Sequence, residues 1–150
     1  MEICPDIVGL LKQVGLEYDS KREEANLEFK WKLPEGKVIL WLDSQKTYRI
    51  FENLIVNITK YALENTRVYI EMDVIGDQVR IVMKNVSASE LNFDTEEITD
   101  RFVRGDVSRK TEGSGLGLAI ARSFTEAQKG SLHIAVDGDL FKVVILWKLS

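Results

Sequence analysis

The sequence predicts a fold of the α+β class, a two-layer α/β sandwich in which helices cover one face of a mixed, mostly antiparallel sheet. Segments with alternating apolar and polar residues occur in pairs along the chain, and single segments with helical periodicity separate the pairs. Strands that follow one another directly tend to pair as antiparallel hairpins, whereas a doubly wound parallel sheet needs a crossover helix between its strands. The paired strands therefore favour the sandwich.

The first half of the chain is expected to hold two helices and four strands. Residues 5–25 predict a helix, because apolar residues from Ile7 to Tyr18 recur at helical spacing. Asp43 or Ser44 can cap a second helix, which ends near residue 63 and has one apolar face. The strands are expected at residues 27–33, 37–42, 66–73 and 78–84, with turns at residues 34–36 and 76–77.

The second half adds one helix and one hairpin. The helix is expected over residues 116–127, directly after a glycine-rich segment. Strands at residues 131–137 and 140–148 flank Gly138-Asp139, a typical hairpin turn. Residues 86–113 lack clear periodicity, apart from a short helix near residues 95–102. A loop of this length in a compact domain is usually functional or mobile.

Composition limits the class of protein. The 150 residues suggest one domain, large enough to bury a core, and the net charge of −4 argues against general nucleic-acid binding. Cys4 is the only cysteine, so an internal disulfide is impossible, and the usage fits a reducing, cytosolic compartment. Neither a signal peptide nor an apolar run of about 18 residues is visible. Any membrane anchor is expected outside this chain.

Gly113, Gly115 and Gly117 lead into the third helix at alternate positions. Glycine lets the backbone approach a ligand closely, and a helix N-terminus presents unpaired N–H groups, which together suit a phosphate. Glycines also permit tight helix–sheet packing with no ligand. The segment lacks the Lys-Ser or Lys-Thr of a Walker motif, and no strand leads directly into it, as a dinucleotide fingerprint would require.

The second helix carries a polar stripe of Asn53, Asn57, Lys60 and Glu64. Asparagine is a mediocre helix former, so two of them four residues apart need a reason. One reason is a solvated face with contacts between the amides. The other is a magnesium and phosphate site, because an amide oxygen is a hard ligand that suits Mg²⁺ and lysine can meet a phosphate.

A third group of residues precedes the glycines. Arg101, Arg104, Arg109 and Lys110 place four cations within ten residues. Such a charge run is usually a solvated face, but beside a phosphate site it can also clamp a polyphosphate.

In this order the three groups resemble the ATP-binding catalytic domain of bacterial sensor histidine kinases, part of the larger group that includes gyrase and the heat-shock chaperone ATPases. Residues 53–61 resemble the N box, residues 101–106 the F box and residues 113–118 the second glycine box of that family. The resemblance covers residues 27–149 and implies the Bergerat ATP-binding fold.

The resemblance also implies roles for single residues. Asn57 would bind Mg²⁺, Lys60 would contact the phosphates and Tyr61 would border the nucleotide. Asn53 stands where gyrase and chaperone relatives carry a glutamate that activates water, and its absence suits a kinase that should not hydrolyse ATP. The triphosphate would be wrapped by the backbone N–H groups of Gly113, Gly115, Leu116 and Gly117. Either Arg104 or Arg109 would reach the terminal phosphate from a lid.

Two departures from the family pattern limit these expectations. The first glycine box, Asp-x-Gly-x-Gly in the family, is replaced by a segment in which Asn85 stands at the aspartate position and both glycines are missing. A neutral amide accepts a weaker hydrogen bond from adenine than a carboxylate does, so weaker ATP binding or a differently shaped lid hinge is expected. His133 is the only histidine and is expected on the outer face of the sheet, so the phosphoacceptor histidine is expected on another part of the parent protein or on a partner, and no catalytic residue is assigned in this chain.

The preferred hypothesis is an ATP-binding module of a sensor histidine kinase that presents Mg-ATP to a histidine on a separate dimerisation domain. Residues 1–25 would then hold a linker helix, and residues 26–150 the catalytic domain. A response regulator receiver domain is the expected further partner, and the module is expected to be the cytoplasmic portion of a membrane-anchored sensor. Two alternatives are a degenerate module that docks without turnover and a free-standing serine kinase of the anti-sigma-factor type.

Overall fold

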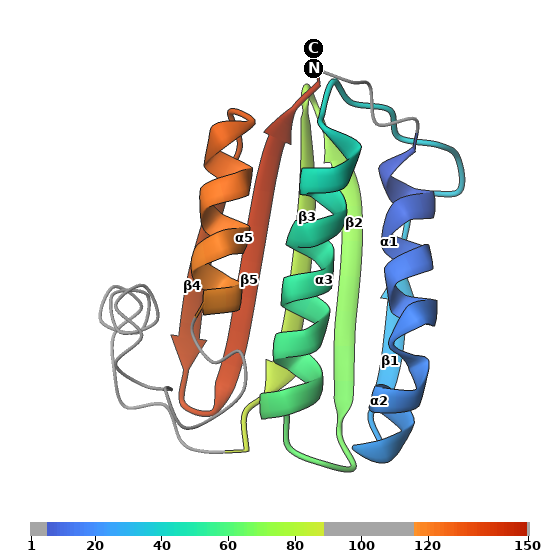
Figure 1. Ribbon diagram of the computed structural model, residues 1–150, viewed down its shortest axis with the longest axis vertical. Coiled ribbons are helices and arrows are strands. Elements are labelled where there is room, and N and C mark those ends of the chain that lie inside the picture. The colour runs from blue at the N-terminus through green and yellow to red at the C-terminus, as the bar shows by residue number, and fades with distance from the viewer. Residues whose placement is uncertain (1–5, 89–115, 150) are drawn as a thin grey trace.

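The chain forms one five-stranded sheet whose one face is covered by helices (Figure 1). The computed structural model describes residues 6–88 and 116–149. The strand order is β1-β2-β3-β5-β4, and the pairs are antiparallel except for β1 with β2. The predicted α+β sandwich is confirmed. Its elements are α1 (Ile7–Glu17), α2 (Asp19–Glu24), β1 (Glu28–Lys32), α3 (Ser44–Tyr61), β2 (Arg67–Ile75), β3 (Gln78–Val86), α5 (Leu116–Ala127), β4 (Ser131–Asp137) and β5 (Leu140–Lys148).

The helix predicted over residues 5–25 is two helices. Asp6 caps α1, because its carboxylate accepts hydrogen bonds from the backbone N–H groups of Val8 and Gly9. Tyr18 leaves helical geometry with φ −106° and ψ 20°, and α2 begins at the next residue. Periodicity was a correct guide to the buried face of α1, since Ile7, Leu11 and Val14 are fully buried, but it did not locate this break.

The strand predicted at residues 37–42 is wrong. This segment is an irregular connection that buries Val38, Leu40 and Leu42, and its backbone meets α1 where Ile7 N donates to Val38 O over 2.9 Å. The physical reason is the parallel pairing of β1 with β2, which requires a crossover. Helix α3 makes that crossover, so the apolar segment before α3 covers the core instead of pairing as a hairpin with β1.

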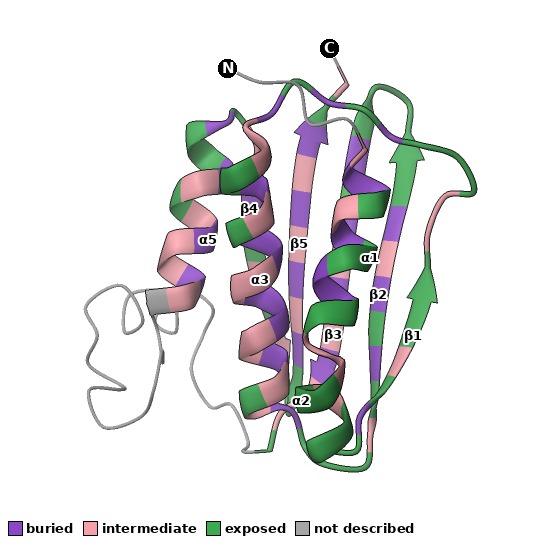
Figure 2. Ribbon diagram, turned by 45° about the vertical axis from the view of Figure 1, so that its right-hand side comes forward, coloured by how far each residue is buried: buried purple, intermediate pink, exposed green. Residues whose placement is uncertain are grey.

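The core lies between the sheet and the three longer helices. Figure 2 shows buried and exposed residues alternating along β2, and it shows the buried side of α3 against the sheet. Phe51 is fully buried and meets Trp147 of β5 edge-on, with ring centroids 6.5 Å apart. His133 is exposed and its neighbour Leu132 is buried, so the histidine lies on the face away from the helices, as predicted.

Candidate functional site

Helices α3 and α5 lie side by side and run in opposite directions (Figure 1). A hydrogen-bonded clamp joins the end of α5 to the start of α3: Gln128 Oε1 accepts from Asp43 N over 2.6 Å, and Gln128 Nε2 lies 3.3 Å from Thr47 Oγ1. Because the helices are antiparallel, this clamp places the start of α5 beside the second half of α3. The first turn of α5, which holds Gly117, therefore lies beside the asparagine stripe.

Asn53 and Gly117 lie next to each other where the two motifs approach. A Cβ built on Gly117 would lie 3.7 Å from the Asn53 Cβ and 3.8 Å from its Oδ1. These are ordinary van der Waals distances, so an alanine would fit here without a clash in the domain as it stands. Packing against α3 therefore does not require glycine at this position.

Two polar atoms of α3, one in its middle and one at its last residue, are buried without a hydrogen-bond partner among the described residues. They are Asn53 Nδ2 and the Tyr61 hydroxyl oxygen. A buried donor without a partner is destabilising by about 1–3 kcal/mol, so such groups usually mark a place where a ligand or water completes the bonding. Asn57, one helical turn beyond Asn53, is half-buried on the same stripe.

The far end of this region is formed by the ends of α3 and β3. Asn85 is only 4% exposed, and it shares the helix-covered face with Ile81 and Met83. Backbone hydrogen bonds tie the two ends together, from Leu63 N to Val86 O over 2.8 Å and from Ala88 N to Tyr61 O over 2.9 Å. A buried amide costs free energy unless it is hydrogen-bonded, so Asn85 needs a polar partner at the end of an otherwise apolar strand face.

Lys60 lies at the other border of the stripe. It is exposed and lines a hollow of about 340 Å³ together with Tyr18, Lys21 and Glu24 from the α1–α2 side. The structure therefore brings Asn53 and Gly117 into contact, with Asn57 on the same stripe. Asn85 and Tyr61 lie at one end of this region. Lys60 also faces α2. The backbone of Leu116 begins α5. The predictions for Arg104, Arg109, Gly113 and Gly115, and for the helix near residues 95–102, lie outside the described residues.

A polar brace between α1 and α3 was not predicted from the sequence. The Tyr18 hydroxyl donates to Glu52 Oε2 over 2.7 Å, and the Tyr48 hydroxyl donates to Glu17 Oε1 over 2.5 Å. Glu52 thus points toward α1 and away from the side of α3 that holds Asn53. The hydrogen bond to Glu17 raises the pKa of Tyr48 to about 12, and burial followed by the bond to Glu52 raises the pKa of Tyr18. The spacing of these residues on separate helices gave no signal of the contact.

This brace predicts a loss of stability at alkaline pH. Both tyrosines have a higher pKa in the folded chain than their ordinary value of about 10. Their contribution to the free energy of unfolding is therefore fully present below about pH 10 and is lost as the pH rises toward about 12. We expect the midpoint of denaturation to decrease as the pH is raised from about 9 to about 11.5. The midpoint of the double variant Tyr18→Phe/Tyr48→Phe should decrease less over that interval. Equal slopes of the midpoint against pH for parent and variant would contradict the assignment.

Two negative findings apply to the described residues. Among residues 6–88 and 116–149, no group of three or more His, Cys, Asp or Glu side chains could hold a metal ion. Within the same ranges, no helix is both long and apolar enough to cross a membrane.

The sequence is similar to those of known proteins. Residues 42–149 match the family described as histidine kinase-, DNA gyrase B-, and HSP90-like ATPase. The chain is 37% identical over 116 residues to the probable sensor protein PcoS of Escherichia coli. This match covers 75% of this chain and 25% of PcoS. It is 32% identical over 114 residues to the sensor histidine kinase WalK of Bacillus subtilis, which covers 73% of this chain and 19% of WalK. The chain thus spans about a quarter or less of these relatives.

Solved structures agree with the fold. The catalytic domain of the histidine kinase ThkA superposes with a TM-score of 0.83 at 20% identity, covering 99% of this chain and 97% of that one. The Acinetobacter baumannii histidine kinase AdeS gives a TM-score of 0.77 at 16% identity, covering 100% of this chain and 68% of that one. With the family match over most of its length, the chain belongs to the histidine kinase-, DNA gyrase B- and HSP90-like ATPases, as an ATP-binding domain of the sensor histidine kinase type.

Proposed function

We propose that this domain binds Mg-ATP where α3 meets the start of α5 and presents the terminal phosphoryl group to a histidine on a separate dimerisation domain. The observation that carries the proposal is the contact between Asn53 and Gly117, beside a buried amide nitrogen that has no described partner. Two motifs that are 64 positions apart in sequence thereby share one site. Backbone N–H groups at the start of α5 and the positive end of its dipole favour a polyphosphate there.

The residues present fit a magnesium ion that is held mainly through ATP. The described residues offer no cluster of acidic or histidine ligands, but Asn57 offers a half-buried amide oxygen. Mg²⁺ keeps several waters and binds substrate phosphates together with one or two hard protein ligands, so a single amide suffices. When bound, the ion would neutralise phosphate charge.

The remaining roles follow from position. Asn85 would accept a hydrogen bond from adenine at the end of β3, and Tyr61 would border the nucleotide at the end of α3. Lys60 would meet the phosphates from the α2 side of the stripe. Backbone amides at Gly113, Gly115, Leu116 and Gly117 would hold the triphosphate, and Arg104 or Arg109 would reach its terminal phosphate.

Catalysis by this chain would consist of positioning and charge neutralisation, the main contributions to enzymatic phosphoryl transfer. Asn53 has no carboxylate with which to activate water, which suits a kinase that should not hydrolyse ATP. The acceptor histidine would come from the dimerisation domain of a longer parent kinase, and a response regulator receiver domain would take the phosphoryl group next. We place the domain in the cytoplasmic portion of a membrane-anchored sensor, with residues 1–25 leading in from the dimerisation domain.

Gly117→Ala tests the proposal because stability and binding should change in opposite directions. Alanine fits the space beside Asn53, and it favours a helix over glycine by roughly 0.5–1 kcal/mol, so the nucleotide-free domain should not lose stability. If the backbone must approach a phosphate, the added methyl should weaken Mg-ATP binding by about tenfold or more. Urea denaturation and calorimetric titration of Mg-ATP measure the two quantities.

The same titration distinguishes a nucleotide-binding domain from the main alternative, a docking module without turnover. The neutral Asn85 at the adenine end favours that alternative. Absence of any heat of binding at millimolar Mg-ATP for the parent chain would overturn the nucleotide site. Binding with unchanged affinity in Gly117→Ala would show that the nucleotide does not approach this backbone. If a partner is phosphorylated, acid-stable phosphate would indicate serine and acid-labile phosphate would indicate histidine.

A further inference from the structure

The face of the sheet opposite the helices concentrates positive charge in a chain whose net charge is −4. The strand registers place Lys30, Tyr69, Lys84 and Lys142 in a single row across β1, β2, β3 and β5. Adjacent strands are about 4.8 Å apart, so the row brings these side chains within reach of one ligand. Arg67 lies two residues before Tyr69 on the same face of β2.

One pair of residues in this row is expected to destabilise the sheet. Lys84 and Lys142 are direct cross-strand partners, and like charges directly opposite one another are destabilising. Lys84 is only weakly compensated, because its Nζ lies 4.0 Å from Glu71 Oε2 and 5.5 Å from the centre of the Tyr69 ring. Within residues 6–88 and 116–149, the side chain of Lys142 makes no hydrogen bond or ion pair. A local arrangement that opposes stability without visible compensation indicates a functional surface.

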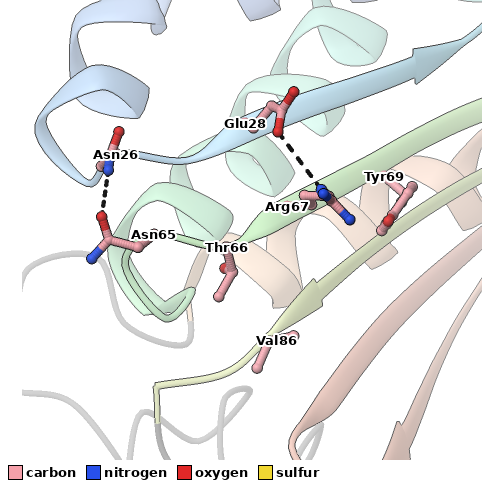
Figure 3. Close-up of a pocket in the computed structure, with 7 residues that line it drawn as sticks. All are labelled: Asn26, Glu28, Asn65, Thr66, Arg67, Tyr69 and Val86. Atoms are coloured by element: carbon pink, nitrogen blue, oxygen red, sulfur yellow. Dashed lines mark hydrogen bonds and ion pairs between the residues drawn. The ribbon is translucent and has the colours of Figure 1, made fainter.

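Beside the row, Arg67 lines an open hollow of about 570 Å³ (Figure 3). Arg67 and Tyr69 follow each other along β2, and Asn26, Asn65 and Thr66 close one end. The guanidinium is loosely held, since Arg67 Nε is 3.7 Å from Glu28 Oε1 while Lys30 Nζ is 2.8 Å from the other oxygen of Glu28. Its planar set of N–H donors suits a carboxylate or a phosphate.

We infer that this surface, made of Arg67, Tyr69, Lys84 and Lys142, docks an acidic polypeptide segment that carries several Asp or Glu side chains. Glu28 and Glu71 lie between the cations, so a uniformly negative membrane or nucleic acid would meet two like charges at close range. A polypeptide can place carboxylates beside the cations and leave the positions opposite these glutamates neutral. The surface lies on the opposite side of the sheet from the proposed nucleotide site, so it is independent of that function.

The test is binding of a fluorescent poly-glutamate peptide to the full chain, followed by anisotropy at low and high salt. We expect binding at low ionic strength that weakens steeply as salt is added. The double variant Lys84→Gln/Lys142→Gln should bind about five- to tenfold more weakly. The matched control Lys12→Gln/Lys37→Gln removes the same charge away from this face and should keep most of the affinity.

A single reversal, Lys142→Glu, separates the functional explanation from a structural one. It replaces a like-charge cross-strand pair with an opposite-charge pair, so its thermal unfolding midpoint should rise or stay unchanged while peptide binding is lost. Three results would overturn the inference. The first is no peptide binding at low salt, and the second is an equal loss of peptide affinity in the control variant. The third is binding to phosphatidylserine vesicles or to DNA that is stronger than binding to the peptide and is also removed by Lys142→Glu.

Discussion

Asn57→Ala is expected to weaken binding of ATP in the presence of magnesium by at least about tenfold, because it removes the one hard oxygen ligand proposed for the ion. The side chain is half-buried on α3, on the stripe that faces the start of α5. Without magnesium the parent chain and the variant should differ much less. Calorimetric titration of ATP with excess Mg²⁺ and again with a chelator measures both affinities.

Gln45→Ala is the matched control for this prediction. Gln45 is an exposed amide near the start of the same helix, where it lines a hollow with Leu10 and Tyr48, and it plays no part in the proposed site. Its affinity for Mg-ATP should equal that of the parent chain. An Asn57→Ala variant that binds Mg-ATP as tightly as Gln45→Ala would show that the amide stripe is only a solvated helix face.

Phe51→Ala should lower the free energy of unfolding by about 3–5 kcal/mol, the range for removing a fully buried aromatic side chain. The ring fills the space between α3 and the sheet, where it meets Trp147 edge-on. Because the same helix carries Asn53 and Asn57, the loss should also weaken Mg-ATP binding by loosening the site. Urea denaturation followed by circular dichroism gives the stability change.

Phe29→Ala serves as the comparison, because Phe29 is only half-buried on the edge strand β1 and should lose less stability. Equal losses in the two variants would mean that α3 is not the main contact between the helical layer and the sheet. A loss below about 1 kcal/mol for Phe51→Ala would contradict the core described here.

Local patterns were sufficient for most elements but not for their pairing. The helix over residues 116–127 and the strands at residues 131–137 and 140–148 have the predicted bounds, because strong periodicity and a Gly-Asp turn mark them. The partner of β1 was predicted wrongly. Alternation of apolar and polar residues shows which side of a strand is buried, but it does not distinguish a parallel neighbour 39 residues away from a nearby antiparallel one.

The candidate site shows the same division between local and distant information. Two asparagines at helical spacing identified the stripe on α3, and the glycines identified the start of α5. Their contact depends on the antiparallel packing of α3 and α5 and on the Gln128 clamp, which no local pattern encodes. The burial of Asn85 and the bond from Tyr18 to Glu52 likewise arise only when distant elements pack.

The most direct test of a joint nucleotide site is hydrogen–deuterium exchange of the full chain with and without saturating Mg-ATP. We predict slower exchange of backbone amides in two separate segments, residues 113–120 of the glycine-rich sequence and residues 53–61 of α3, and the protection should be lost when magnesium is chelated. Protection confined to one of these segments, or absent from both while ATP is bound, would contradict the shared site.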